Sequence, residues 1–126
     1  MEPYEFLNIE RALIGVVRTR CRVDSAVDIP KPRPPEFVQV SRVGGTAGEI
    51  ADRPMVTFFC WAESWGAAHD LAALTKRRMH SLTRLEELPV YRVREVGGLS
   101  RAPDPVDGSP RYQFTLELRL RGKQAP

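Results

Sequence analysis

Few side chains in this 126-residue chain have the chemistry of catalysis or metal binding. Two histidines, His69 and His80, are eleven positions apart on one predicted helix. That spacing is about three helical turns, which is too far for both rings to bind one metal ion. His69 and Asp70 are adjacent and point in different directions, and no serine or cysteine stands in a nucleophile elbow such as Gly-x-Ser-x-Gly. The sequence therefore predicts no metal site, no hydrolase triad and no cofactor.

Three other groups of residues are explained by local structure rather than by catalysis or ligand binding. Glu86 and Glu87 stand just before a predicted strand, where a solvated turn explains them better than paired acid-base catalysis. Lys76-Arg77-Arg78 fans out around the end of a predicted helix, where positive charge suits the helix dipole. A nucleic-acid contact is an alternative for this run, although no exposed aromatic residues interleave with it. Gly44-Gly45 and Gly97-Gly98 do not lead into helices, so neither predicts a phosphate-binding loop.

The composition predicts one soluble domain that covers residues 1–126, since 42% of the residues are hydrophobic and 28% are charged. The excess of 19 basic over 16 acidic residues is too small to require a nucleic-acid or membrane partner. Cys21 and Cys60 form no Cys-x-x-Cys motif, and two free thiols are expected. No apolar run reaches the ~18 residues of a membrane span. The acidic first residues do not resemble a secretory signal, so a cytoplasmic product is expected.

The first half of the chain predicts a helix, a proline-rich connector and two strands. Phe6, Ile9, Leu13 and Val16 recur at helical spacing, which predicts a helix over 3–18. Residues 29–35 contain so many prolines that we expect an extended connector close to polyproline II, with a ligand for a separate domain as the alternative. Strands are expected over 37–43 and 54–61, with Gly44-Gly45 ending the first and a polar loop over 46–53. The second strand has apolar groups on both faces, which predicts a central strand covered on both sides.

The second half predicts one helix and two more strands. Ser64 is a suitable N-cap for a helix to about Leu82, with one stripe of small and apolar residues facing a sheet. A strand over 90–96 is expected to end at Gly97-Gly98, and a turn-rich loop follows over 102–108. Residues 111–121 alternate apolar and polar without interruption, as a strand with one buried face does. The whole predicts an α+β fold in which two helices pack on an antiparallel sheet of about four to five strands.

The two predicted hairpins share a pattern. Each has a Val-Gly-Gly sequence before its connection and a strand that follows a proline, Pro54 in the first and Pro110 in the second. Both connections are longer than the two to five residues that a hairpin needs. We therefore expect these hairpin tips to contact another molecule.

The order of these motifs resembles that of the tail terminator proteins of long-tailed bacteriophages, above all the small versions in phages of actinobacteria. The resemblance runs from about Arg11 to Arg121 and rests on structural motifs rather than on catalytic ones. They are Asp52-Arg53-Pro54, Cys60-Trp61-Ala62, His69-Asp70-Leu71-Ala72, Tyr91-Arg92-Val93-Arg94-Glu95-Val96-Gly97-Gly98 and Pro110-Arg111-Tyr112-Gln113-Phe114-Thr115-Leu116-Glu117-Leu118-Arg119.

The resemblance implies a structural virion protein of the tail and neck that is not an enzyme and that assembles in the host cytoplasm. Six copies would form a ring at the head-proximal end of the tail tube, stop polymerisation of the tube protein, and bind the head stopper or completion protein. A head-tail stopper or a tail-completion protein of the neck is the alternative, because related neck proteins share a similar small fold. Two other classes stay open: a small enzyme that uses His69 or Glu87, and a DNA-binding accessory protein whose affinity falls with salt.

Candidate interface residues follow from the predicted hairpin tips. Their mixed charges suggest ion pairs between subunits or with the tube, which set register and partner choice more than affinity. They are Arg42, Glu49, Asp52, Arg53, Arg94, Arg101, Asp104 and Asp107. Trp65, in the first turn of the predicted helix, is expected either in the core or as a partly exposed interface anchor. DNA must pass through the ring without specific binding, and the polar face of the last strand is the candidate channel lining: Arg111, Gln113, Thr115, Glu117 and Arg119.

Overall fold

The computed structural model describes residues 4–5, 7–47, 51–121 and 123–124. In chain order the elements are β1 (Tyr4–Glu5), α1 (Ile9–Val16), the π-helical turn η1 (Val17–Cys21), β2 (Asp24–Ala26), β3 (Phe37–Ala47), β4 (Ala51–Trp61), α2 (Trp65–His80), β5 (Arg84–Leu85), β6 (Leu88–Arg101), β7 (Arg111–Arg121) and β8 (Lys123–Gln124). The predicted α+β class, with two α-helices among the described residues, is confirmed.

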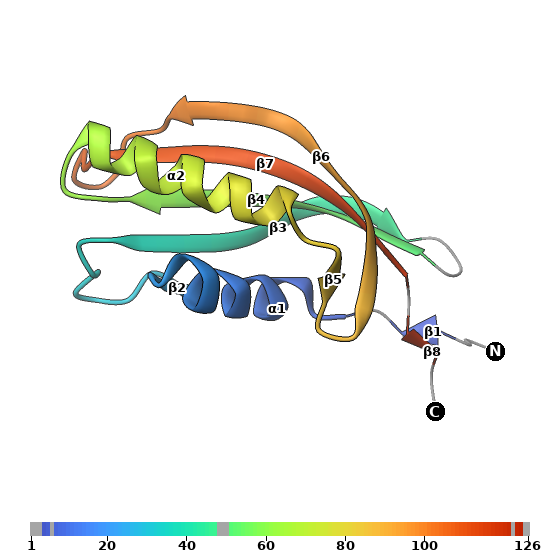
Figure 1. The fold of residues 1–126 in the computed structure, drawn as a ribbon. Coiled ribbons are helices and arrows are strands. Elements are labelled where there is room, and N and C mark those ends of the chain that lie inside the picture. The colour runs from blue at the N-terminus through green and yellow to red at the C-terminus, as the bar shows by residue number, and fades with distance from the viewer. Residues whose placement is uncertain (1–3, 6, 48–50, 122, 125–126) are drawn as a thin grey trace.

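The main sheet has six strands in the order β2-β3-β4-β7-β6-β5, and it curls around the helices (Figure 1). Its neighbouring strands are antiparallel except β2 and β3, which are parallel, and β1 and β8 form a separate antiparallel pair. The prediction of an antiparallel sheet of four to five strands is therefore wrong in strand number and in direction. With three residues, β2 is too short to show an alternating pattern. Residues 27–36 bring the chain back to the start of β2, so β3 runs parallel to it.

Both helices lie on one face of the sheet (Figure 1). α1 contacts β3, and α2 contacts β4, β6 and β7. Phe58 of β4 and Phe114 of β7 stack at the centre of the core with their ring centroids 4.9 Å apart. The strands also contribute Val38, Val40, Val56, Cys60, Leu116, Leu118 and Leu120 to this core. β4 lies inside the sheet as predicted, but among the described residues the helices cover only one of its faces.

The helix over 3–18 begins later than predicted. Asn8 caps it, since its side chain accepts a 3.2 Å hydrogen bond from the backbone N–H of Arg11. Tyr4–Glu5 instead forms the strand that pairs with β8, while residues 1–3 and 6 lie outside the described residues. A left-handed residue, Arg22, ends the helical segment.

The predicted helix after Ser64 is confirmed. The Ser64 hydroxyl accepts a 3.1 Å hydrogen bond from the backbone N–H of Ala67, and the helix runs to His80. Its buried side chains, Ala68, Leu71, Ala72, Thr75 and Met79, lie on one stripe, as predicted, whereas Leu82, which was also expected on this stripe, lies beyond the end of the helix. Within the described residues, no helix has the length and apolar character needed to cross a membrane.

The two glycine pairs do not end strands as predicted. β3 continues past Gly44-Gly45 to Ala47, and β6 continues past Gly97-Gly98 to Arg101. The pairs lie instead at shifts of strand register, which are typical of β-bulges. Only residues 48–50, outside the described residues, remain between β3 and β4, so the polar loop over 46–53 was predicted too long. The connection from β6 to β7 stays long, because residues 102–110 belong to no strand.

Candidate interaction surfaces

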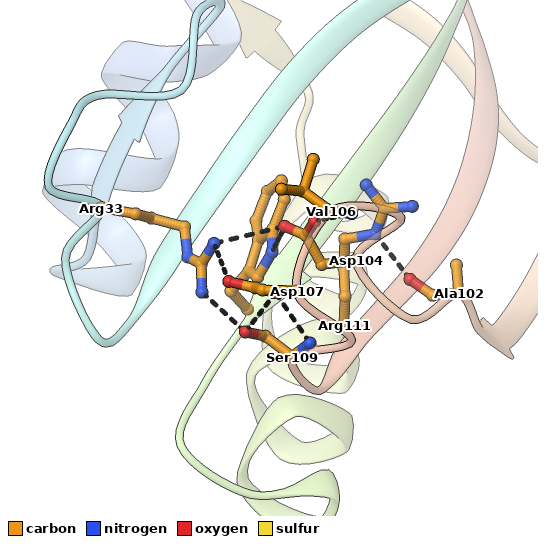
Figure 2. Close-up of polar contacts among 8 residues, drawn as sticks. Arg33, Ala102, Asp104, Val106, Asp107, Ser109 and Arg111 are labelled. Carbon is orange, nitrogen blue, oxygen red and sulfur yellow. Dashed lines mark hydrogen bonds and ion pairs between the residues drawn. The ribbon is translucent and has the colours of Figure 1, made fainter.

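One polar cluster holds together three parts of the chain at the end of the sheet where β7 begins. Asp104, in the loop between β6 and β7, has only 7% of its surface exposed. Its carboxylate accepts hydrogen bonds from the indole N–H of Trp61 at 3.0 Å and from the backbone N–H of Val106 at 2.8 Å. Arg33, from the proline-rich segment, donates a third at 3.2 Å (Figure 2). Asp104 thus connects this loop to β4 and to the segment 29–35.

Asp107 and Ser109 extend this cluster. The Asp107 carboxylate accepts from the backbone N–H of Ser109 at 2.9 Å and from its hydroxyl at 2.6 Å. Arg33 donates to the same hydroxyl at 3.2 Å and lies 3.8 Å from Asp107 (Figure 2). The hydrogen bond from the backbone N–H of Val106 is the main cause of the lowered pKa of Asp104, and burial of this carboxylate opposes the shift. The hydrogen bond from the Ser109 hydroxyl lowers the pKa of Asp107. Both carboxylates are therefore ionised at neutral pH.

Arg111, the first residue of β7, contacts the start of the same loop. Its Nε donates a 2.6 Å hydrogen bond to the carbonyl oxygen of Ala102 (Figure 2). Its guanidinium lies 4.6 Å from the ring centroid of Phe59 and 5.3 Å from that of Trp61. Such cation–π contacts stabilise an arginine over an aromatic face. The loop, which was predicted as a hairpin tip that contacts another molecule, is thus bound at both ends within its own chain.

A cavity of about 310 Å³ lies beside this cluster, between the proline-rich segment and the loop. Its lining includes three prolines, and it also includes Ile29 and Val106, which have 39% and 93% of their surfaces exposed. Arg33 lines the same cavity. Nothing in the sequence of the proline-rich segment indicated that Arg33 would contact Asp104. A buried tryptophan needs a hydrogen-bond acceptor for its indole N–H. This need was the sequence signal that Trp61 would have a polar partner such as Asp104.

Two of the four predicted interface residues of the first hairpin are paired with each other. Arg42 and Asp52 form an ion pair of 3.1 Å in which the side chain of Asp52 is only 2% exposed. Arg53 is exposed, and Glu49 lies outside the described residues. The assignment of these residues to a subunit or tube interface stays a prediction.

The predicted interface residues of the second hairpin also contact their own chain. Arg94 pairs with Glu117 across β6 and β7 at 3.2 Å. The guanidinium of Arg101 lies 4.5 Å from the ring centroid of Trp65. The half-buried Trp65 meets the ring of Tyr112 edge to face at 5.9 Å. Their part in an interface stays a prediction as well.

The predicted channel residues share the face of the sheet that is opposite the helices, which we call the open face. Arg111, Gln113, Thr115, Glu117 and Arg119 alternate along β7 with the buried residues of the core. Across β4 and β7 the hydroxyls of Thr57 and Thr115 are 2.7 Å apart.

The strand register adds four more arginines to the open face. They are Arg53 of β4, Arg92 and Arg94 of β6, and Arg121 of β7. Arg53 and Arg94 were predicted as interface residues but not as part of this face. The i, i+2 spacing of Arg92 and Arg94, and of Arg119 and Arg121, was the sequence signal for a shared face.

Of the side chains with catalytic potential, His69 meets the ring of Tyr112 edge to face at 5.4 Å, beside Trp65. His69 and Asp70 do not point apart as predicted, because His69 Nδ1 is 3.3 Å from the carboxylate of Asp70; both side chains are exposed. Glu86 and Glu87 form the turn between β5 and β6, as the sequence suggested. Within the described ranges, no three histidine, cysteine or acidic side chains are grouped to hold a metal ion.

Cys21 and Cys60 are free and buried, which confirms the prediction of two free thiols. Burial raises the pKa of both thiols, so they are protonated at neutral pH.

Comparison with models of known protein families finds none that matches this chain, and no curated protein sequence matches it.

Proposed function

We propose that this chain is the tail terminator of a long-tailed bacteriophage, a structural subunit that caps the tail tube. Six copies form a ring on the last tube ring and cover the edge to which the next tube ring would add. The ring also offers a surface to the head stopper or completion protein. This steric mechanism needs no cofactor, and it is supported by the motif order over about 11–121 and by an α+β fold with two helices.

The observation that carries the proposal is exposed apolar surface along both lateral sides of the sheet, on its outer long strands β3 and β6. β3 pairs with β2 only through residues 37–39, and β6 pairs with β5 only through Leu88 and Pro89. Beyond these short pairings Val43 of β3 is 54% exposed, and Tyr91 and Val96 of β6 are 53% and 43% exposed. All three lie at the register shifts of their strands. Exposed apolar residues on strand edges favour contact with another chain.

Two different surfaces on one subunit are what a closed ring requires. In cyclic assembly, one surface of each copy meets another surface of the next copy. β3 and β6 lie on opposite sides of the central pair β4 and β7. In the ring, the β3 side of each subunit contacts the β6 side of the next subunit. Because this contact repeats around the closed ring, the β3 and β6 sides of every subunit are covered. In this arrangement the helices lie outside and the polar open face lines the opening, through which DNA passes without specific binding.

Tail length in a phage that carries this gene tests the proposal. We expect electron micrographs of lysates without the gene to show abnormally long tubes without heads, because nothing stops tube growth. Expression of the chain from a plasmid should restore the normal length, which serves as the control for effects on neighbouring genes. Tubes of normal length that fail to join heads would contradict the proposal and indicate a stopper or tail-completion protein instead.

A further inference from the structure

Positive charge is concentrated on the open face of the sheet. On the four long strands this face carries six arginines and one acidic residue, Glu117. The arginines are Arg53 of β4, Arg92 and Arg94 of β6, and Arg111, Arg119 and Arg121 of β7. Without these residues, the 19 basic and 16 acidic residues of the chain fall to 13 and 15, so the rest of the chain is slightly negative. The acidic residue of the short edge strand β2, Asp24, lies beyond β3 at the margin of this face.

Three of these arginines form a row across neighbouring strands. Arg92 and Arg119 are direct register partners of β6 and β7. Asp52 pairs with Leu120, which places Arg53 beside Arg119 on the same face. Neighbouring strands are only about 4.8 Å apart, and like charges directly opposite each other destabilise a sheet.

Among the described residues, little compensates for this repulsion. Of the six arginines, only Arg94 forms an ion pair with a described residue, Glu117 at 3.2 Å. Arg111 is held by Phe59 and by the carbonyl of Ala102. In the part of the chain that the structure describes, Arg53, Arg92, Arg119 and Arg121 have no carboxylate within ion-pair distance. A polyanion is the ligand that would neutralise this row.

We infer that the open face binds the phosphate backbone of double-stranded DNA without reading its sequence. The planar guanidinium group of arginine is well matched to phosphate oxygens. A duplex presents about one negative charge per 1.7 Å, or roughly six over the ~10 Å between β4 and β6, so each of the four arginines without a carboxylate partner among the described residues can meet its own phosphate. Gln113 and Ser100 add neutral donors of the kind that contact phosphates. Both α-helices of the described residues lie on the other face, so neither is positioned to enter a groove of DNA bound here (Figure 1).

Double-stranded DNA fits this face better than an acidic protein does. Interfaces between proteins usually have an apolar centre, whereas interfaces with DNA are more polar and more positive. The exposed apolar residues of the long strands, Val43, Tyr91 and Val96, lie on β3 and β6 rather than on the central strands β4 and β7. The large apolar ring of Phe59 on this face lies under Arg111. The inference concerns the single chain, so it stands or falls independently of ring formation.

Binding of a fluorescent 30-base-pair duplex, measured by anisotropy over a salt series, tests this inference. The wild-type chain should bind duplexes of different sequence equally at low salt. A variant with Arg53→Gln, Arg92→Gln, Arg119→Gln and Arg121→Gln should bind at least tenfold more weakly. Its slope of log K against log salt should be shallower by about 3.6, since each phosphate contact contributes about 0.9. The single variant Arg119→Gln should make the slope shallower by about 0.9, which keeps the test valid if the fourfold variant does not fold.

A matched control removes the same charge from the helical side. The fourfold variant of Arg11, Arg20, Arg77 and Arg78 to glutamine alters exposed residues of α1, η1 and α2. We expect it to keep most of the affinity and most of the salt slope. Equal losses in both variants would overturn the inference, because net charge alone would then explain the binding. No binding by the wild-type chain, or displacement of the duplex by polyglutamate at equal charge concentration, would overturn it as well.

Discussion

At the scale of single residues, Asp104 joins segments that are far apart in the sequence. Its carboxylate accepts from Trp61 of β4, from Arg33 of the proline-rich segment and from the backbone of its own loop. A buried acceptor with several donors is costly to remove, because each donor is left without a partner. The position of the loop and of the segment 29–35 therefore depends on this one side chain.

Substitution Asp104→Ala should lower the free energy of unfolding by about 2–3 kcal/mol, because it leaves the Trp61 N–H and the Arg33 guanidinium without an acceptor. Urea denaturation followed by tryptophan fluorescence measures this loss. Asp28→Ala is the matched control, since Asp28 is exposed, and it should change the value by no more than about 0.5 kcal/mol. Equal effects of the two substitutions would show that the buried contacts of Asp104 do not stabilise the fold.

The same residue predicts how stability depends on pH. Its pKa is lowered in the folded chain, mainly by the hydrogen bond from Val106, while an unfolded aspartate titrates near about 3.9. The ionised carboxylate of Asp104 therefore stabilises the fold fully above the pKa of the unfolded chain. This stabilisation is lost as the pH falls from the unfolded pKa through the lower pKa of the folded chain. In urea titrations, the difference in free energy of unfolding between wild type and Asp104→Asn should shrink below about pH 4. Parallel stability curves between pH 7 and pH 3 would contradict this prediction.

At the scale of elements, the bulge in β3 depends on Gly45. Its φ of +102° lies in the region that favours glycine. A Cβ at this position would overlap the backbone oxygen of Arg53 on β4. The bulge therefore explains why a glycine pair stands within this strand rather than at its end.

Substitution Gly45→Ala should destabilise the chain by about 2 kcal/mol or more, from backbone strain and from the clash with β4. Thermal unfolding followed by circular dichroism measures the effect as a lower Tm. Gly66→Ala is the control, because a Cβ added to this glycine of α2 would meet no neighbouring atom within 4 Å, and alanine favours a helix. The control should hold or raise the Tm, and a similar Tm for both variants would disprove the steric role of Gly45.

At the scale of the whole molecule, three surfaces of the sheet have different roles. Its inner face forms the core with the helices, its open face carries the arginines, and its two sides carry the exposed apolar residues. The proposed ring uses the sides, and the proposed DNA contact uses the open face. Substitutions can therefore affect one function without the other.

Substitution Val96→Lys should abolish tail termination while leaving the fold intact, because it places a charge on the β6 side of the subunit contact. The free energy of unfolding should change by no more than about 0.5 kcal/mol, as is usual for an exposed position. Complementation of the gene deletion, scored by tail length in electron micrographs, measures the loss. Val106→Lys makes the same exchange in the loop, away from both sides, and should complement fully. Normal tails with Val96→Lys and Val43→Lys together would exclude these sides as the ring contact.

Local patterns in the sequence determined the elements whose signals lie within one stretch of chain. The helix capped by Ser64, the buried stripe of that helix and the alternating strand over 111–121 were all predicted, and so was the α+β class. These features depend on periodicity and capping, which act between residues a few positions apart.

Only the tertiary structure decided the parallel strand β2, the bulges at the glycine pairs, the contact of Arg33 with Asp104 and the row of arginines on the open face. Each of these depends on which residues face one another across neighbouring strands or loops. Arg33 and Asp104 are 71 positions apart in the sequence. Strand register is set by packing of the whole core and by the bulges, and a shift of one residue would turn each side chain to the opposite face.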